Sequence, residues 1–186
     1  MRLLVAALVA LLLAATSSLA DDGPSRKLLM MPPATAAFAP DGKSVLRSVR
    51  VADDPALGRA YDLSLSTLAN AGATQVLRFH RGVSIAWSAD SRAFLLTEHL
   101  GSNVSVCHLY RLDRLAYPID LTAPAYAAVA DPRVKQTSHS YVYCLGWLDA
   151  TRVALELTGH LDGPPGGSFR HSLTYDMASG TMRQND

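Results

Sequence analysis

The chain has 186 residues, a formal net charge of +1 and 49% hydrophobic residues, which is enough material for one domain with a buried core. Its charge is balanced, and lysine and arginine are not clustered, which argues against nucleic-acid binding. No basic amphipathic stretch indicates attachment to a membrane surface. Composition therefore favours a globular protein that binds neither nucleic acid nor lipid through charge.

The first 20 residues have the pattern of a secretory signal peptide. Arg2 precedes an unbroken apolar run from Leu3 to Ala15, and the small residues Ser18 and Ala20 suit a cleavage site. The run is shorter than the roughly 20 residues that a membrane-spanning helix needs. We therefore expect cleavage after Ala20, export of the protein, and no membrane span in the mature chain.

A short pattern occurs three times after residues 21–34, a proline-containing lead-in that we expect to be flexible. Each copy has an aromatic residue, a polar turn with an aspartate, and a basic residue before a β-rich run. The aromatic residues are Phe38, Trp87 and Trp147, the aspartates are Asp41, Asp90 and Asp149, and the basic residues are Lys43, Arg92 and Arg152. We expect the aromatic residues to pack between units and each aspartate to bond within its own turn.

Each copy continues with a strand that contains a tyrosine and then an outer strand. The tyrosines, which we expect to be equivalent, are Tyr61, Tyr110 and Tyr175. The sequence thus predicts an all-β fold in one domain, 35–186. Its three four-stranded antiparallel meanders, stacked propeller-like, are expected at about 35–80, 83–122 and 140–184. Alanines bounded by prolines predict one short helix near 124–131.

The repeated turns resemble the repeat of TolB-like, or WD40-like (PD40), β-propellers. The segments concerned are Phe-Ala-Pro-Asp-Gly-Lys at 38–43, Trp-Ser-Ala-Asp-Ser-Arg at 87–92 and Trp-Leu-Asp-Ala-Thr-Arg at 147–152. The resemblance covers residues 35 to about 184. It implies a propeller-like scaffold and a periplasmic location rather than full secretion, but little about activity. Propellers typically have four or more blades, so three units imply an open stack, a degenerate fourth unit, or pairing with a second chain.

The two cysteines, Cys107 and Cys144, permit two interpretations. A pair in an exported protein is often a disulfide, whereas buried thiols in strands act as small apolar side chains. Strand parity disfavours the bridge, because Cys107 alternates with His108 along its predicted strand and Cys144 is placed on the face opposite Trp147. The sequence leaves both interpretations open.

Two histidines, His99 and His160, occupy corresponding positions where the second strand of a unit ends. With neighbouring polar residues they are expected to rim one groove. The predicted binding residues are His99, Glu98, Ser102, Asn103, His160 and Asp162. Two imidazoles and a carboxylate are zinc ligands in many proteins, but their spacing does not support a metal site, and solvent-facing strand ends are the alternative. No metal or cofactor is predicted, and the other four histidines show no pattern.

Function is predicted mainly by what the sequence lacks. It contains no Gly-x-Ser-x-Gly elbow, Cys-x-x-Cys, His-Glu-x-x-His or glycine-rich phosphate loop, so we predict no catalytic residues. We expect an exported, non-enzymatic binding module that presents loops to a protein or glycan of the cell envelope. Two alternatives stay open: an envelope hydrolase or metal-binding protein using His99, His160 and Glu98, and a structural subunit that completes a ring, for example as a homodimer.

Overall fold

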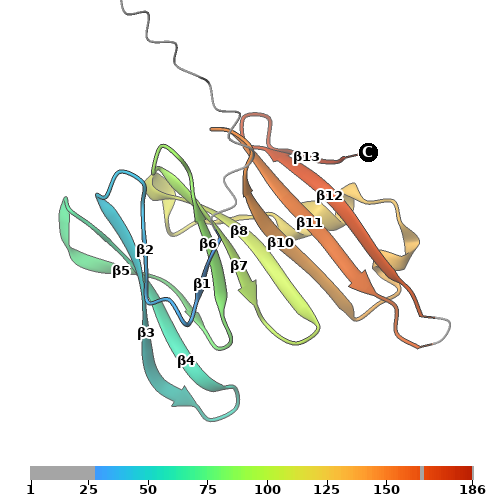
Figure 1. Cartoon of the computed structure of the whole chain (residues 1–186), viewed down its shortest axis with the longest axis horizontal. Coiled ribbons are helices and arrows are strands. Elements are labelled where there is room, and N and C mark those ends of the chain that lie inside the picture. Colours follow the sequence, from blue (N-terminus) through green and yellow to red (C-terminus); the bar gives the residue numbers. More distant parts are fainter. Residues whose placement is uncertain (1–27, 164–165, 186) are drawn as a thin grey trace, which may run out of the picture.

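In the computed structural model of the chain, the structure describes residues 28–163 and 166–185. These residues are mostly β-strands in two sheets, with one α-helix in the described part (Figure 1). The expected signal peptide at 1–20 and the first part of the lead-in, 21–27, lie outside the described residues. Within the described ranges, no helix is long and apolar enough to cross a membrane.

Three antiparallel meanders follow one another along the chain. Unit 1 consists of β2 (Ala36–Phe38), β3 (Ser44–Asp54), β4 (Gly58–Thr67) and β5 (Asn70–Phe79). Unit 2 consists of β6 (Val83–Trp87), β7 (Ala93–His99), β8 (Val104–Arg111) and β9 (Ile119–Asp120). Unit 3 consists of β10 (His139–Trp147), β11 (Arg152–His160), β12 (Ser168–Asp176) and β13 (Thr181–Gln184). The predicted all-β class with antiparallel pairing is confirmed.

The units form two sheets because units 2 and 3 share one. Unit 1 is a four-stranded sheet, whereas β8 and β10 pair in parallel through Ser105 and Tyr141 and so join the other two units. A further strand, β1 (Leu29–Met31), pairs with β6, and its Met31 is fully buried. The expected flexible lead-in is therefore a β-strand over Leu29–Met31.

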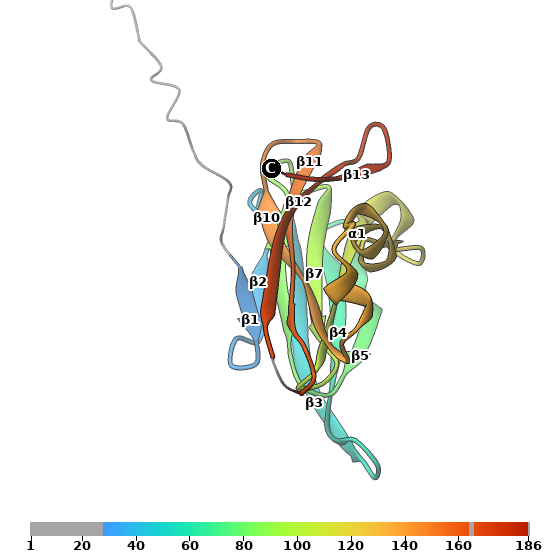
Figure 2. The ribbon, with the colours of Figure 1, turned by 90° about the vertical axis from the view of Figure 1, so that its right-hand side faces the viewer.

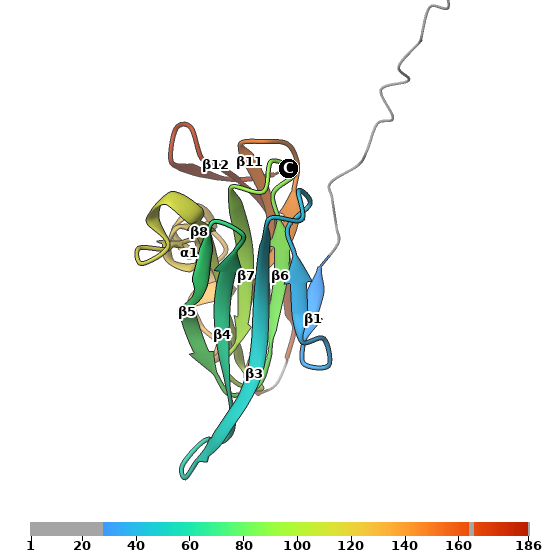
Figure 3. The same ribbon diagram turned by 90° about the vertical axis from the view of Figure 1, so that its left-hand side faces the viewer.

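Unit 2 lies between two apolar cores because its strands alternate faces. One face packs Phe94 and Leu96 against unit 1, and the other packs Leu95 and Leu109 against unit 3. The second core also contains the helix α1, which lies on the side of the molecule away from β1 and β2 (Figures 2 and 3). Each unit thus buries its apolar side chains against a neighbour.

The helix α1 spans Thr122–Ala128, so it begins and ends slightly earlier than the predicted 124–131. It ends there because Val129 returns to an extended conformation. Two short 3-10 helices complete the described elements, η1 (Leu112–Arg114) before β9 and η2 (Pro132–Lys135) after α1.

The aromatic residue that begins each unit contacts the unit before it. Trp87 Nε1 donates a hydrogen bond to the Ala37 carbonyl at 3.2 Å, and Trp147 Nε1 donates to the Ala86 carbonyl at 3.1 Å. The two contacts are equivalent, because each alanine directly precedes the aromatic residue of its own unit. Phe38 belongs to the first unit of the described residues and is 64% exposed. The predicted packing between units holds for both tryptophans and is wrong for Phe38.

The turn aspartates bond within their own turns, as predicted. Asp41 Oδ1 accepts from the Lys43 N–H at 2.9 Å, Asp90 Oδ1 from the Arg92 N–H at 3.1 Å, and Asp149 Oδ1 from the Thr151 N–H at 2.9 Å. Unit 2 has Ser91 where unit 1 has Gly42, and both adopt a positive φ, 61° and 68° respectively. This conformation disfavours a side chain by about 1–2 kcal/mol. Ser91 Oγ offsets part of that cost by accepting a hydrogen bond from the Asp41 N–H at 3.0 Å.

The three tyrosine strands are not fully equivalent. Tyr110 pairs with Phe94 and Tyr175 with Val153, each opposite the residue that pairs with the tryptophan of its unit. Tyr61 instead pairs with Arg50, further along the strand, because the hairpin of β3 and β4 is long and protrudes from the molecule (Figure 3). The expected equivalence of Tyr61 is wrong.

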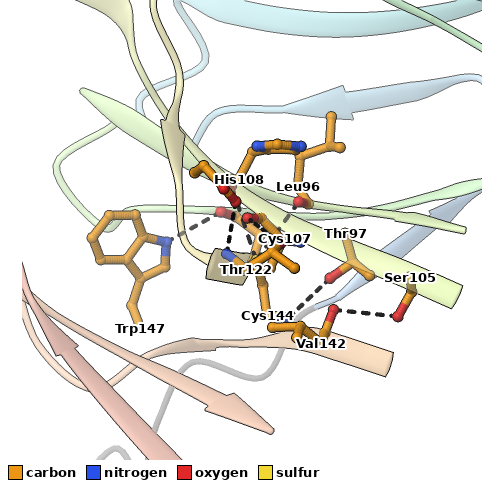
Figure 4. The surroundings of a disulfide bond; sticks show 11 residues. Leu96, Thr97, Ser105, Cys107, His108, Thr122, Val142, Cys144 and Trp147 are labelled. Carbon is orange, nitrogen blue, oxygen red and sulfur yellow. Dashed lines mark hydrogen bonds between the residues drawn. A yellow bond between two sulfur atoms is a disulfide. The ribbon is translucent and has the colours of Figure 1, made fainter. Parts of the chain in front are cut away.

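A disulfide joins units 2 and 3 (Figure 4). Cys107 of β8 and Cys144 of β10 have Cα atoms 5.6 Å apart, and Thr97 Oγ1 accepts a hydrogen bond from the Cys144 N–H at 2.9 Å beside them. The parity argument against the bridge is wrong, because parity relates residues within a strand, whereas these cysteines come from two units whose faces meet.

Candidate functional site

Five aromatic side chains lie along one edge of the nine-stranded sheet, meaning the edge formed by strand ends and not by an outermost strand. β7 and β11 end there and β10 begins there. They come from units 2 and 3. The five residues, called the His–Tyr row below, are His99, His139, Tyr141, Tyr143 and His160.

Strand register explains why these residues meet. β10 contributes three of them at alternate positions, and alternate residues of a strand share a face. His160 joins the row because it pairs with His139 across β10 and β11. His99 enters from β7: its partner in β8 is Ser105, which in turn pairs with Tyr141. The row therefore depends on the junction between units 2 and 3.

The two tyrosine rings lie across the sheet toward unit 2. Tyr141 Oη donates a hydrogen bond to the Ser102 carbonyl, in the turn between β7 and β8, at 2.7 Å. The ring of Tyr143 has its centroid 6.1 Å from that of His99. The tyrosine rings are parallel within 2°, with centroids 6.0 Å apart. Both are half-buried, so each ring contacts the protein and keeps part of its surface in solvent.

A polar cluster ends the row at unit 3. The imidazoles of His139 and His160 stack with centroids 4.3 Å apart. Asp162 Oδ1 lies 2.6 Å from His139 Nδ1, and its Oδ2 accepts hydrogen bonds from the N–H and Oγ of Ser138 at 2.9 and 3.0 Å. The Ser138 N–H, followed by the His139 side chain, lowers the pKa of Asp162, so this carboxylate is an anion at neutral pH. The Thr137 hydroxyl donates to the His160 carbonyl and ties the loop to β11.

Charged side chains on the same face balance one another. Glu156 pairs with Tyr143 in the strand register, and Arg170 lies beyond Thr158, which pairs with Tyr141. Arg170 Nε is 3.4 Å from Glu156 Oε2. The tyrosines are thus bordered by groups that can donate and accept hydrogen bonds, while the ion pair leaves little net charge.

The predicted binding residues divide between the row and other surfaces. Four of them gather at the row: His99, His160, Asp162 and Ser102. Asn103 lies in the same turn as Ser102 and contributes its backbone, since its carbonyl accepts a hydrogen bond from the Ser140 N–H at 3.1 Å. Most of the predicted set therefore lies along one edge.

Glu98 faces unit 1 instead, because adjacent residues of a strand point to opposite faces. Its partner Val83 is buried in the core between units 1 and 2. Burial raises the pKa of Glu98, and the charge of His80 opposes that rise. Glu98, His80 and Arg81 line a cleft of about 300 Å³ at the end of β7. His99 borders this cleft, but its imidazole points to unit 3, so no single groove holds Glu98 with both predicted histidines.

His99 and His160 are not equivalent in the structure. Trp87 pairs with Phe94, seven residues later, whereas Trp147 pairs with Val153, six residues later. The turn of unit 3 is one residue shorter, so the residue of unit 3 that corresponds to His99 is Thr158. His160 lies two residues further along β11 and meets the row through His139.

Serine hydroxyls contact two of the histidines, but neither contact forms a nucleophilic site. Ser138 Oγ and Asp162 both approach Nδ1 of His139, whereas a hydrolytic triad needs the hydroxyl and the carboxylate on opposite ring nitrogens. Ser84 Oγ is 3.2 Å from Nε2 of His99, yet Ser84 is only 7% exposed. Burial lowers the pKa of His99, so its ring is neutral and can accept this hydrogen bond.

Metal-binding residues are not brought together in the part of the chain that the structure describes. There, no group of three or more histidine, cysteine, aspartate or glutamate residues could hold a metal ion.

Sequence reasoning misses the centre of the row, which is His139, Tyr141 and Tyr143. Their signal was the alternation His-x-Tyr-x-Tyr within a predicted strand, which places three aromatic side chains on one face. The contribution of His99 depends on the parallel pairing of β8 with β10, and local sequence gives no sign of that pairing.

Two hollows that are each lined in part by a tryptophan lie away from the row. One, of about 530 Å³, lies at the turn end of units 2 and 3 and is lined by Arg92, Arg111 and Trp147 among others. The other, of about 450 Å³, is an apolar cleft beside Phe38 and Leu28. Neither contains a predicted binding residue.

Comparison with known proteins gives a likeness of fold. No protein-family model and no curated protein matches the chain. A solved structure of a variant AtxE2 isopeptidase with astexin3-dC4 bound is 12% identical with a TM-score of 0.50, covering 82% of this chain and 28% of that chain. The apo isopeptidase is also 12% identical, with a TM-score of 0.46 and the same coverage. TolB from Acinetobacter baumannii is 16% identical with a TM-score of 0.42, covering 81% and 31%. The chain thus spans less than a third of these proteins.

Proposed function

We propose that this protein is an exported, non-enzymatic binding module that uses the His–Tyr row and its adjoining loops to bind a protein or glycan of the cell envelope. The observation that carries the proposal is the construction of the row from both units. Aromatic side chains with hydrogen-bonding neighbours are well suited to recognition, because they combine apolar contact area with polar groups.

The row is also held in place before any partner arrives. Tyr141 bonds to the turn of unit 2, and Asp162 bonds to the loop that enters β10. Loops on a rigid sheet are common positions for binding residues. Groups that are already fixed lose less conformational entropy on binding, which favours a recognition surface at this edge.

The periplasm is the compartment that we propose. The leader-like residues 1–20 favour export, and the disulfide between Cys107 and Cys144 suits an oxidising compartment. We further propose that the units are TolB-like repeats in an open, propeller-like stack. The equivalent hydrogen bonds of Trp87 and Trp147 support this, because they repeat one contact between successive units.

Neither alternative function gains a specific observation. A hydrolase or metal site would need Glu98 beside His99 and His160. Glu98 faces unit 1, whereas His99 points to unit 3 and His160 stacks on His139. A ring-completing subunit would need apolar surface at both ends. Unit 1 exposes Phe38, but unit 3 presents Glu156 and Arg170 at its open face.

The proposal is tested by capture from an envelope extract. The bait is the mature protein, compared with Tyr143→Ala in the row and Tyr117→Ala, a matched control at an 81% exposed tyrosine elsewhere. We expect a component that the mature protein and the control retain and that Tyr143→Ala loses. Reproducible failure to capture any component, with or without detergent, or equal capture by all three baits, would contradict the proposal.

A further inference from the structure

We infer that the ligand of the His–Tyr row is an uncharged oligosaccharide. This inference rests on the proposed function and narrows it to one class of ligand. It starts from two parallel tyrosine rings, a balanced set of charges and a border of hydroxyl, imidazole and carboxylate groups on one sheet face.

The tyrosine rings offer the apolar part of such a site. A pyranose ring has a face of C–H groups, whose slightly positive hydrogens are attracted to the negative face of an aromatic ring. Tyr141 and Tyr143 lean in the same direction, with centroids 6.0 Å apart and planes within 2°. The rings are stacked and half-buried, so their exposed parts together offer a sugar a larger apolar surface than a single exposed aromatic residue does.

The border of the row offers partners for sugar hydroxyls. Thr158, Glu156 and Arg170 lie on the same face as the tyrosines by register. The stacked imidazoles of His139 and His160 lie at the other side. Each sugar hydroxyl both donates and accepts, so a mixture of donors and acceptors suits it better than a cluster of one kind.

The charged side chains near the row favour an uncharged ligand over an anionic one, because they are already paired. Arg170 lies beside Glu156, and Asp162 is held by Ser138 and His139. A site for phosphate-rich polymers needs several unpaired cations, whereas here each acid and the arginine already has a partner. An uncharged ligand can enter without leaving a buried charge unpaired.

The test is isothermal titration calorimetry of the mature protein with two uncharged probes, N-acetylchitohexaose and cellohexaose. We expect at least one to bind. Tyr143→Ala should weaken that binding by about tenfold or more, as for loss of a central aromatic contact, and Tyr117→Ala should leave it within about twofold. Tyr143→Leu serves if the alanine variant fails to fold, since it keeps apolar bulk and lacks the ring.

Two results would overturn the inference: neither probe binds, or a probe binds equally to the mature protein and the row variants. In either case, a protein captured from envelope extract that depends on Tyr143 would leave the proposed binding function standing. Loss of that capture as well would remove the function along with the ligand class.

Discussion

The faces between units and the faces at the two ends of the stack are built from the same strands with different side chains. In the second strand of each unit, the second position after the partner of the aromatic residue is Leu96 in unit 2, Leu155 in unit 3 and Arg47 in unit 1. Both leucines are fully buried against the preceding unit. Arg47 belongs to the first unit of the described chain and is exposed.

The other end of the stack follows the same rule. The residue directly after the partner of the aromatic residue is Leu46 in unit 1 and Leu95 in unit 2, and each is buried toward the following unit. In unit 3 the corresponding residue is only Ala154. The third residue after the partner of the aromatic residue is the buried Thr97 in unit 2 and the half-buried Glu156 in unit 3. Unit 3 is the last unit of the described chain, and its outer face carries polar side chains.

This comparison shows that a few positions decide whether a unit is internal or terminal. Repeat proteins need polar outer faces on their end units to stay soluble. Here Arg47 and Glu156 place polar groups at the two ends, while Phe38 and Val49 leave apolar surface exposed on unit 1. The His–Tyr row lies partly on the open face of unit 3, where no neighbour covers it.

The largest difference in stability is expected between substitutions of two aromatic residues that begin units, Trp147 and Phe38. Trp147→Ala should lower the free energy of unfolding by about 3–5 kcal/mol, because it leaves a cavity between units 2 and 3. Phe38→Ala, the matched change at the open end, should lower it by less than about 1 kcal/mol, since Phe38 is 64% exposed. Urea unfolding followed by circular dichroism measures both. Similar losses for the two variants would show that the end face is packed like the interior.

The disulfide should contribute the next largest effect. The double variant Cys107→Ala and Cys144→Ala should be less stable by about 2–4 kcal/mol, because the unfolded chain gains freedom without the link. The same urea titration measures this loss. As a control, a reducing agent should lower the stability of the original protein to that of the variant and leave the variant unchanged. A variant as stable as the oxidised protein would refute the expectation.

Restoring an interior pattern on both open faces should cause self-association. Arg47→Leu combined with Ala154→Leu gives the end units the leucines found at the buried positions. The resulting apolar patches favour contacts between molecules. Light scattering should detect a rise in mass with concentration, whereas Arg59→Leu, at an exposed arginine away from these positions, should scatter as the original does. A doubly substituted protein that stays at its original mass would argue that these positions do not define the ends.

The smallest effect concerns a turn. Hydrogen bonds, first from the Thr151 N–H, lower the pKa of Asp149 to about 2. Because the folded pKa lies below the unfolded value of about 3.9, the contribution is present above that value and is lost as the pH falls toward 2. The side chain is partly exposed, so we expect only a few tenths of a kcal/mol. Asp149→Asn should therefore be slightly less stable at pH 5 and nearly equal at pH 2; an equal difference at both values would exclude this origin.

Local patterns predict the meanders and miss the contacts that depend on register between units. The Asp-containing turns and the alternating strands near Trp87 and Trp147 are local, and the structure has them. The position of His160 relative to His99 depends on a turn that is one residue shorter, and the pairing of Cys107 with Cys144 depends on two faces meeting. Neither is encoded within a single strand. Phe38 is exposed because no other unit of the described chain packs against it. Its own turn sequence does not indicate this.

The bridge between Cys107 and Cys144 closes a segment of the chain with a sequence separation of 37. In an oxidised chain that has unfolded, units 2 and 3 therefore remain tethered, and their mutual search during refolding is short. Unit 1 lacks such a bridge and is joined to unit 2 by the chain from Phe79 to Val83 alone. We expect units 2 and 3 to assemble first and unit 1 to dock last, so the Trp87 contact marks the final step of refolding and the first place at which the stack opens.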